Sequence, residues 1–140
     1  MLFRSTLMNI LAGTFSPDSG SIIIDGKEIT HMTPSKAMQL KIRFIHQELN
    51  LCNDLKVYEN MFLGNELYTK IHTVDKKEEI ARAEKVLKDM HADIPAQALV
   101  DDLETAEKQL VEIAKALSLN AKILIMDEPT SALKIGRAHV

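Results

Sequence analysis

The chain has 140 residues, 17 of them basic and 20 acidic, and its net charge is −3 with neutral histidines. This length fits one domain or a piece of a larger one, and the 46% hydrophobic and 26% charged composition is that of an ordinary globular protein. The charge gives no general reason to expect nucleic-acid binding, and no apolar run approaches the roughly 20 residues that span a bilayer. A single cysteine excludes a disulfide-stabilised mini-protein.

The first block of the sequence, from Thr6 to about Gln47, mixes short helices and strands. Apolar spacing, β-branched runs and turn residues indicate each element. The predicted elements are a helix over 6–12 ended by Gly13, a turn at 16–20, a strand at 21–25 that turns at 26–27 into a partner at 28–29, a helix over 35–41 opened by Pro34, and a strand over 42–45.

The second block, roughly residues 50–116, is helical. Amphipathic periods predict helices over 75–90 and 104–117, and Asp101 or Asp102 is expected to cap the second. The charged run at 75–79 is interpreted as the solvated start of its helix, with ion pairs four residues apart.

The strongest chemical signal is the segment 123–131, Ile-Leu-Ile-Met-Asp-Glu-Pro-Thr-Ser. Its four apolar residues predict a strand buried on both faces of a parallel sheet. Such a strand delivers Asp127 and Glu128 to the sheet edge where open α/β sheets bind ligands. One acid there can hold Mg²⁺, and its neighbour can orient and deprotonate a water. The alternative is a buried strand that ends at two solvated acids.

This segment resembles the Walker B segment of ABC-type ATPases, and the resemblance continues along the chain in the family's order. It is carried by Arg4–Gly13 (the end of a Walker A loop and its helix), Ser19–Ile22 with Asp25-Gly26 (an early hairpin), Phe44–Leu49 (a Q-loop), Val57–Gly64 (the entry to the helical subdomain) and Leu103–Leu117 (the signature segment). Two stretches, 46–49 and 111–116, most resemble importers of ribose, galactose and xylose.

The resemblance implies an α/β fold: an incomplete P-loop NTPase (ABC ATPase) sheet core with a helical subdomain at about 50–116. The partial nucleotide-binding domain would span 6–133 and be the first of two in its parent chain. Its expected partners are transmembrane permease subunits, a sugar-binding protein and the second nucleotide-binding domain, with no nucleic acid. The expected location is the cytoplasmic face of the membrane.

The resemblance also implies roles for single residues, with ATP as substrate and Mg²⁺ as cofactor. Asp127 would hold the magnesium shell, and Glu128 would be the general base for hydrolytic water. Gln47 would reach the magnesium or the γ-phosphate and report to the membrane subunits. Ser5 would fall at the magnesium-binding hydroxyl and Thr6 beside the α-phosphate, where the start of a helix adds free amides.

The sequence departs from the family pattern at two motifs. A P-loop needs Gly-x-x-x-x-Gly-Lys-[Ser/Thr], but only Met-Leu-Phe precedes Arg4, which stands where the lysine belongs. The usual Leu-Ser-Gly-Gly-Gln of the signature is replaced by Leu103, Glu104, Thr105, Ala106 and Glu107. Glu104 would bring a carboxylate near the partner domain's phosphate. The alternative for this helix is a scaffold role.

The two ends of the chain, 1–5 and 134–140, can be encoded by reverse-complementary DNA that looks like a short-read library adapter. They are therefore interpreted as non-native, which makes Thr6 the first native residue and the match at Ser5 accidental. The favoured function is the ATP-binding, ATP-hydrolysing subunit of a sugar ABC importer. The alternatives are an ABC ATPase without a transporter and a non-catalytic fragment that binds no nucleotide.

Overall fold

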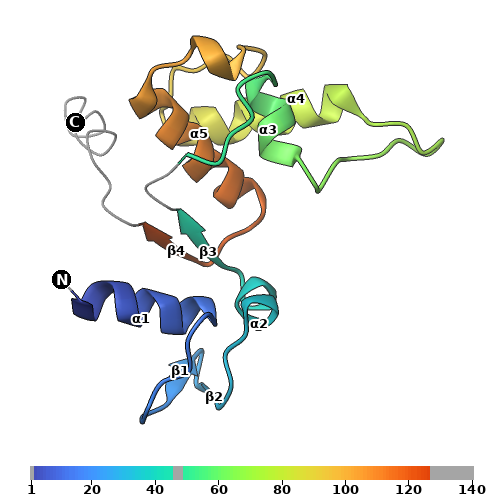
Figure 1. Ribbon diagram of the computed structural model, residues 1–140. Helices are drawn as coiled ribbons and strands as arrows, with labels where there is room; N and C mark the ends of the chain where they lie inside the picture. Colours follow the sequence, from blue (N-terminus) through green and yellow to red (C-terminus); the bar gives the residue numbers. More distant parts are fainter. Residues whose placement is uncertain (1, 46–48, 127–140) are drawn as a thin grey trace. The chain divides into compact units, whose positions relative to one another are not determined.

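A computed structural model describes residues 2–45 and 49–126 (Figure 1). Its elements in chain order are α1 (Leu2–Ala12), β1 (Ile22–Ile24), β2 (Lys27–Ile29), α2 (Pro34–Gln39), β3 (Ile42–Ile45), α3 (Val57–Phe62), α4 (Lys76–Asp89), the 3₁₀ helix η1 (Val100–Asp102), α5 (Thr105–Ser118) and β4 (Ile123–Met126). The mixture of helices and strands confirms the predicted α/β class. The described residues form two compact units, which divide near residues 45 and 120.

In unit 1, helix α1 begins at Leu2, four residues before the predicted start at Thr6. Leu-Phe-Arg-Ser contains no glycine or proline, so nothing in residues 2–5 opposes helical backbone. The helix ends at Gly13 as predicted, with φ +79°. The N–H of Gly13 donates to the Ile10 carbonyl at 3.1 Å and that of Thr14 to the Asn9 carbonyl at 2.9 Å, as at a glycine-terminated helix end.

Strands β1 and β2 form the predicted antiparallel hairpin, with Ile22 opposite Ile29. The turn residues Asp25 and Gly26 have φ of 51° and 75°. Two positive φ values in a two-residue loop match the twist of a hairpin. Lys27, predicted in the turn, is the first residue of β2 because the turn closes one residue earlier.

The core of unit 1 is small. Its four buried hydrophobic residues are Ile29, Met32, Ala37 and Ile42. Thr33 starts α2 because its hydroxyl accepts the N–H of Lys36 at 3.1 Å, and Pro34 occupies the first helical position.

Strands β3 and β4 pair with each other, and Figure 1 shows their arrows pointing the same way. Their carboxyl ends, Ile45 and Met126, therefore lie at the same edge of the sheet. The prediction that β4 is buried on both faces is wrong, since Ile123 is 38% exposed and the other three residues are half-buried. Within the described residues this sheet has two strands, which is too narrow to enclose an apolar strand.

Unit 2 is built from α3, α4 and α5, which pack against one another. Its buried hydrophobic residues are Val57, Tyr58, Met61, Phe62, Ala83, Leu87, Ile94, Ala96, Val100, Val111 and Ala114. Helices α4 and α5 agree with the predicted helices to within a residue or two at each end. The predicted cap of α5 is wrong: Asp101 and Asp102 lie in η1, and Glu104 is the N-cap residue.

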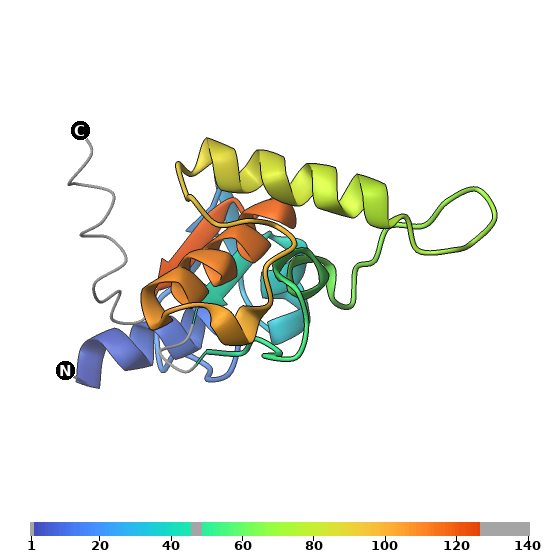
Figure 2. The same ribbon diagram turned by 90° about the horizontal axis from the view of Figure 1, so that it is seen from above.

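The loop between α3 and α4 projects beyond the N-terminal end of α4 (Figure 2). It folds back on itself, with the N–H of Thr69 on the Thr73 carbonyl at 2.8 Å and the N–H of Asp75 on the Leu67 carbonyl at 2.7 Å. Its exposed apolar side chains include Ile71, which is 79% exposed.

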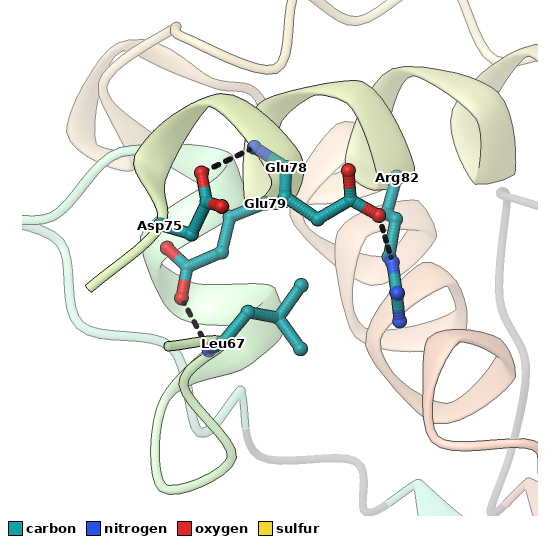
Figure 3. A network of polar contacts seen from close by, with 5 residues as sticks. All are labelled: Leu67, Asp75, Glu78, Glu79 and Arg82. Carbon is teal, nitrogen blue, oxygen red and sulfur yellow. Dashed lines mark hydrogen bonds and ion pairs between the residues drawn. The ribbon is translucent and has the colours of Figure 1, made fainter. Parts of the chain in front are cut away.

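The start of α4 differs from the solvated helix end that the sequence predicted. Asp75 caps the helix and Glu78 pairs with Arg82 at 2.7 Å, both on the surface as expected (Figure 3). Glu79, however, is only 3% exposed, and its carboxylate accepts the N–H of Leu67 at 3.0 Å. The returning loop covers Glu79, and a contact of this kind leaves no trace in helical periodicity.

Two titratable groups of unit 2 have shifted pKa values. Burial raises the pKa of the Tyr58 phenol, and the neighbouring Glu59 carboxylate adds to the shift. Hydrogen bonds from its own N–H and from that of Gly64 lower the pKa of Glu66.

Within the described ranges, no helix is long and apolar enough to cross a bilayer.

Candidate functional site

The described residues bring together the two strands that lead to three predicted site residues, the catalytic Glu128 and the nucleotide-binding Gln47 and Asp127. Strand β3 ends at Ile45, two positions before Gln47, and β4 ends at Met126, directly before Asp127 and Glu128. Gln47, Asp127 and Glu128 themselves lie outside the described residues. Because β3 and β4 run parallel, the chain leaves both strands at the same edge, which is the ligand-binding edge of open α/β sheets.

Ser5 and Thr6 lie on α1, and both side chains are exposed. The structure does not place a helix start at Thr6. In a helix that begins at Leu2, the amides left free for a ligand precede Thr6. The predicted phosphate site at the start of a Thr6 helix is therefore wrong in this chain.

The predicted Mg²⁺ ligands are Ser5, Gln47 and Asp127. Within 2–45 and 49–126, no group of three or more histidine, cysteine, aspartate or glutamate side chains is arranged to hold a metal ion. Of the three predicted ligands, only Ser5 is described, and an exposed hydroxyl in the first turn of a helix is not a metal site by itself. The magnesium assignment therefore depends on Asp127 and Gln47.

The five residues of the predicted signature segment lie at the start of α5. Leu103 is half-buried against the unit 2 core, and Glu104 is the exposed N-cap. Thr105, Ala106 and Glu107 form the first helical turn. The Glu107 carboxylate accepts the N–H of Glu104 at 2.9 Å, so one of the chain's own acids already binds an amide at this helix end.

Besides Glu79, two buried polar residues of unit 2 were not predicted from the sequence. The carboxylate of Glu112, which is 8% exposed, accepts the N–H of Asn50 at 2.6 Å. Asn60, 1% exposed, accepts the N–H of Cys52 at 2.8 Å and donates to the carbonyls of Cys52 at 3.0 Å and Lys56 at 3.2 Å. Both side chains hold the main chain that leads from the predicted Q-loop into the helical unit.

Solved structures with this fold are ATP-binding cassettes. The ADP conformation of the cassette MJ1267 of an ABC transporter is 27% identical, with a TM-score of 0.74 over 97% of this chain and 57% of that one. A nucleotide-free cassette from an ABC transporter is 25% identical, with a TM-score of 0.70 and the same coverage. The predicted P-loop NTPase fold of the ABC ATPase type is thereby confirmed.

The family model described as ABC transporter matches residues 4–131, and the chain belongs to this family. It is 45% identical over 130 residues to a putative ribose/galactose/methyl galactoside import ATP-binding protein of Pseudomonas savastanoi pv. phaseolicola. It is also 45% identical to the ribose import ATP-binding protein RbsA of Bacillus licheniformis. Each match covers 93% of this chain, which spans about a quarter of the length of these relatives. The predicted resemblance to sugar importers is confirmed.

Proposed function

We propose that this chain is part of the ATP-binding and ATP-hydrolysing subunit of a sugar ABC importer. The observation that carries the proposal is its 45% identity, over 93% of its length, to import ATP-binding proteins for ribose and galactose. The subunit would act at the cytoplasmic face of the membrane with transmembrane permease subunits, a sugar-binding protein and a second nucleotide-binding domain.

The proposed nucleotide-binding domain covers residues 6–133 and leaves 1–5 and 134–140 outside. For its helical subdomain we propose residues 50–116, a range that unit 2 includes. The chain contains no Gly-x-x-x-x-Gly-Lys segment, which supports the proposal that it lacks most of a Walker A loop. We use the term completed subunit for residues 6–133 joined to such a loop and to the remainder of an importer subunit of this type.

In the completed subunit, the proposed chemistry takes place where β3 and β4 end. Asp127 would bind Mg²⁺, with Gln47 and the hydroxyl at the Ser5 position as further ligands, and Thr6 would lie beside the α-phosphate. Glu128 would accept the proton of the attacking water. Two parallel strands that end at one edge support this arrangement, because phosphoryl transfer depends on positioning and charge neutralisation.

For the signature segment, 103–107, we propose contact with the nucleotide held by the second domain. Its place at the N-terminus of α5 supports this role, because the positive end of a helix favours anions. Glu104 and Glu107 oppose it, since their carboxylates repel phosphate. A scaffold role for α5 is the alternative.

The test is the Mg²⁺-dependent ATPase activity of the completed subunit with its partners. We expect Glu128→Gln to lower turnover by at least about a hundredfold, as loss of a general base should, and to leave ATP binding intact. Near-normal turnover of this variant would exclude Glu128 as the base. A completed wild-type subunit that binds no ATP would instead support the non-catalytic alternative.

A further inference from the structure

The segment between β3 and α3 contains no helix or strand in its described part, residues 49–56, yet main-chain groups of Asn50, Cys52, Asn53, Leu55 and Lys56 are hydrogen-bonded. Glu112 of α5 holds Asn50, and Asn60 of α3 holds Cys52 and Lys56. Buried side chains of two helices thus replace the hydrogen bonds that regular secondary structure would supply.

The same segment is also tied to the chain just before α5. The N–H of Val100 donates to the Leu55 carbonyl at 3.1 Å, and the N–H of Asp101 donates to the Asn53 carbonyl at 3.1 Å. These contacts attach residues 53–55 to η1, which ends immediately before Leu103. The chain that leaves β3 and the start of α5 are therefore parts of one hydrogen-bonded body within unit 2.

Glu112 differs from the other anchors in its chemistry. It is a buried carboxylate bound to a main-chain N–H, and at 2.6 Å the contact is short, as hydrogen bonds to charged acceptors are. A core leucine at this position would bury more apolar surface and forms helices equally well, so neither packing nor helix propensity explains an acid here. Its geometry explains it, because a hydrogen bond fixes Asn50 in direction as well as in distance.

We propose that Glu112 is a positioning residue that ties the segment leaving β3 to α5. The inference depends on the function proposed above, in which Gln47 precedes this segment and the signature segment begins α5. Asn50 is three residues after Gln47, and Glu112 is two helical turns after Leu103–Glu104. In this proposal, a movement of Gln47 shifts Asn50, and the hydrogen bond between Asn50 and Glu112 transmits that shift to α5 and its signature segment.

The test compares Glu112→Ala with Glu112→Gln in the completed subunit, assembled with its membrane partners. Glu84→Ala is the matched control, since Glu84 is an exposed glutamate on α4 of the same unit. We expect Glu112→Ala to lower sugar uptake per ATP hydrolysed by at least about fivefold, with less than about a twofold change in the KM for ATP. Glu112→Gln should restore coupling, because the amide oxygen accepts the same hydrogen bond.

Hydrogen exchange at the Asn50 amide gives a second readout that does not depend on activity. We expect Glu112→Ala to speed this exchange by about tenfold or more, and Glu112→Gln to change it less. The proposal is overturned if Glu112→Ala couples like Glu84→Ala, if glutamine rescues no better than alanine, or if the Asn50 exchange rate does not change. An inactive wild-type subunit would overturn the proposed function instead, and the exchange rates would still report on the anchor itself.

Discussion

Glu78 and Glu79 are neighbours on α4 with opposite surroundings (Figure 3). The Glu78 side chain is 49% exposed and pairs with Arg82, whose side chain is 58% exposed. Glu79 is buried, and its carboxylate accepts a hydrogen bond from the main-chain N–H of Leu67 in the loop between α3 and α4 (Figure 3). Exposed ion pairs contribute little to stability, whereas a buried amide that loses its acceptor is costly.

We therefore expect Glu79→Ala to lower the free energy of unfolding of the completed subunit by about 1–3 kcal/mol. Glu78→Ala should lower it by less than about 1 kcal/mol. Denaturant titration of both variants, followed by a probe in unit 2, measures the difference. Equal losses would show that the Glu79 contact is no stronger than a surface pair.

In the sequence, Gln47 lies between β3 and residues 50–56, whose main chain Glu112 and Asn60 bind. Because of this place at the joint between strand and helical unit, we expect Gln47→Ala in the assembled importer to reduce sugar uptake more than ATP affinity. Uptake into vesicles and nucleotide titration provide the two measurements. If both fall by the same factor, Gln47 is only a binding residue.

Two residues that sequence reasoning missed, Glu112 and Glu79, have hydrogen-bond partners far from them in the sequence. Glu112 and Asn50 are 62 positions apart, and Glu79 and Leu67 are 12 apart. The place of Glu112 beside Val111 in an amphipathic helix indicates that it could be buried, but helical periodicity does not predict that it binds the N–H of Asn50. Motif residues such as Asp127 were recognisable because their signal is contained in a short segment.

At the scale of elements, local chemistry determined which predictions held. β3 has the predicted bounds, and α4 begins after a capping aspartate that the sequence displays. The start of α1 and the burial of β4 were wrong, because they depend on what precedes a helix and what covers a sheet. Neither is encoded within the element.

The end of α1 provides a test at this scale. A Cβ on Gly13 would lie 2.2 Å from the carbonyl carbon of Thr33, in addition to the strain of its φ of +79°. We expect Gly13→Ala to destabilise unit 1 by more than about 2 kcal/mol, since a left-handed residue alone costs about 1–2 kcal/mol.

Gly26→Ala is its control. Gly26 has φ of +75°, but nothing lies within 4 Å of the added Cβ, so only the backbone strain should appear. Thermal unfolding of the two variants separates the cost of backbone strain from the cost of the Cβ clash with Thr33. A Gly26→Ala loss as large as that of Gly13→Ala would mean that the close approach to Thr33 relaxes at little cost.

At the scale of the whole chain, the 140 residues as they stand should not bind ATP usefully. Without P-loop glycines and lysine, the N-terminus of α1 supplies about 0.3–1 kcal/mol per favourable charge, and millimolar affinity needs about −4 kcal/mol. Among the described residues no further strand covers the edges of the β3–β4 pair, and these edges and the exposed Ile123 also favour aggregation.

We expect a poorly soluble chain with no measurable ATPase activity and no ATP-induced rise in melting temperature. Isothermal titration of refolded material measures the affinity directly. Submillimolar, magnesium-dependent binding would mean that Arg4, Ser5 and Thr6 form a working site on α1.

The parallel pairing of β3 with β4 also has a kinetic consequence. The two strands are neighbours in the sheet, but all of α3, α4 and α5 lies between them in the sequence. Pairing them in an unfolded chain would require closing that whole loop, a cost that slows the formation of non-local strand pairs. Helices α3–α5 make their contacts among themselves, so their docking can shorten the loop in advance. We therefore expect the helices of unit 2 to fold first and the β3–β4 pair to form afterwards.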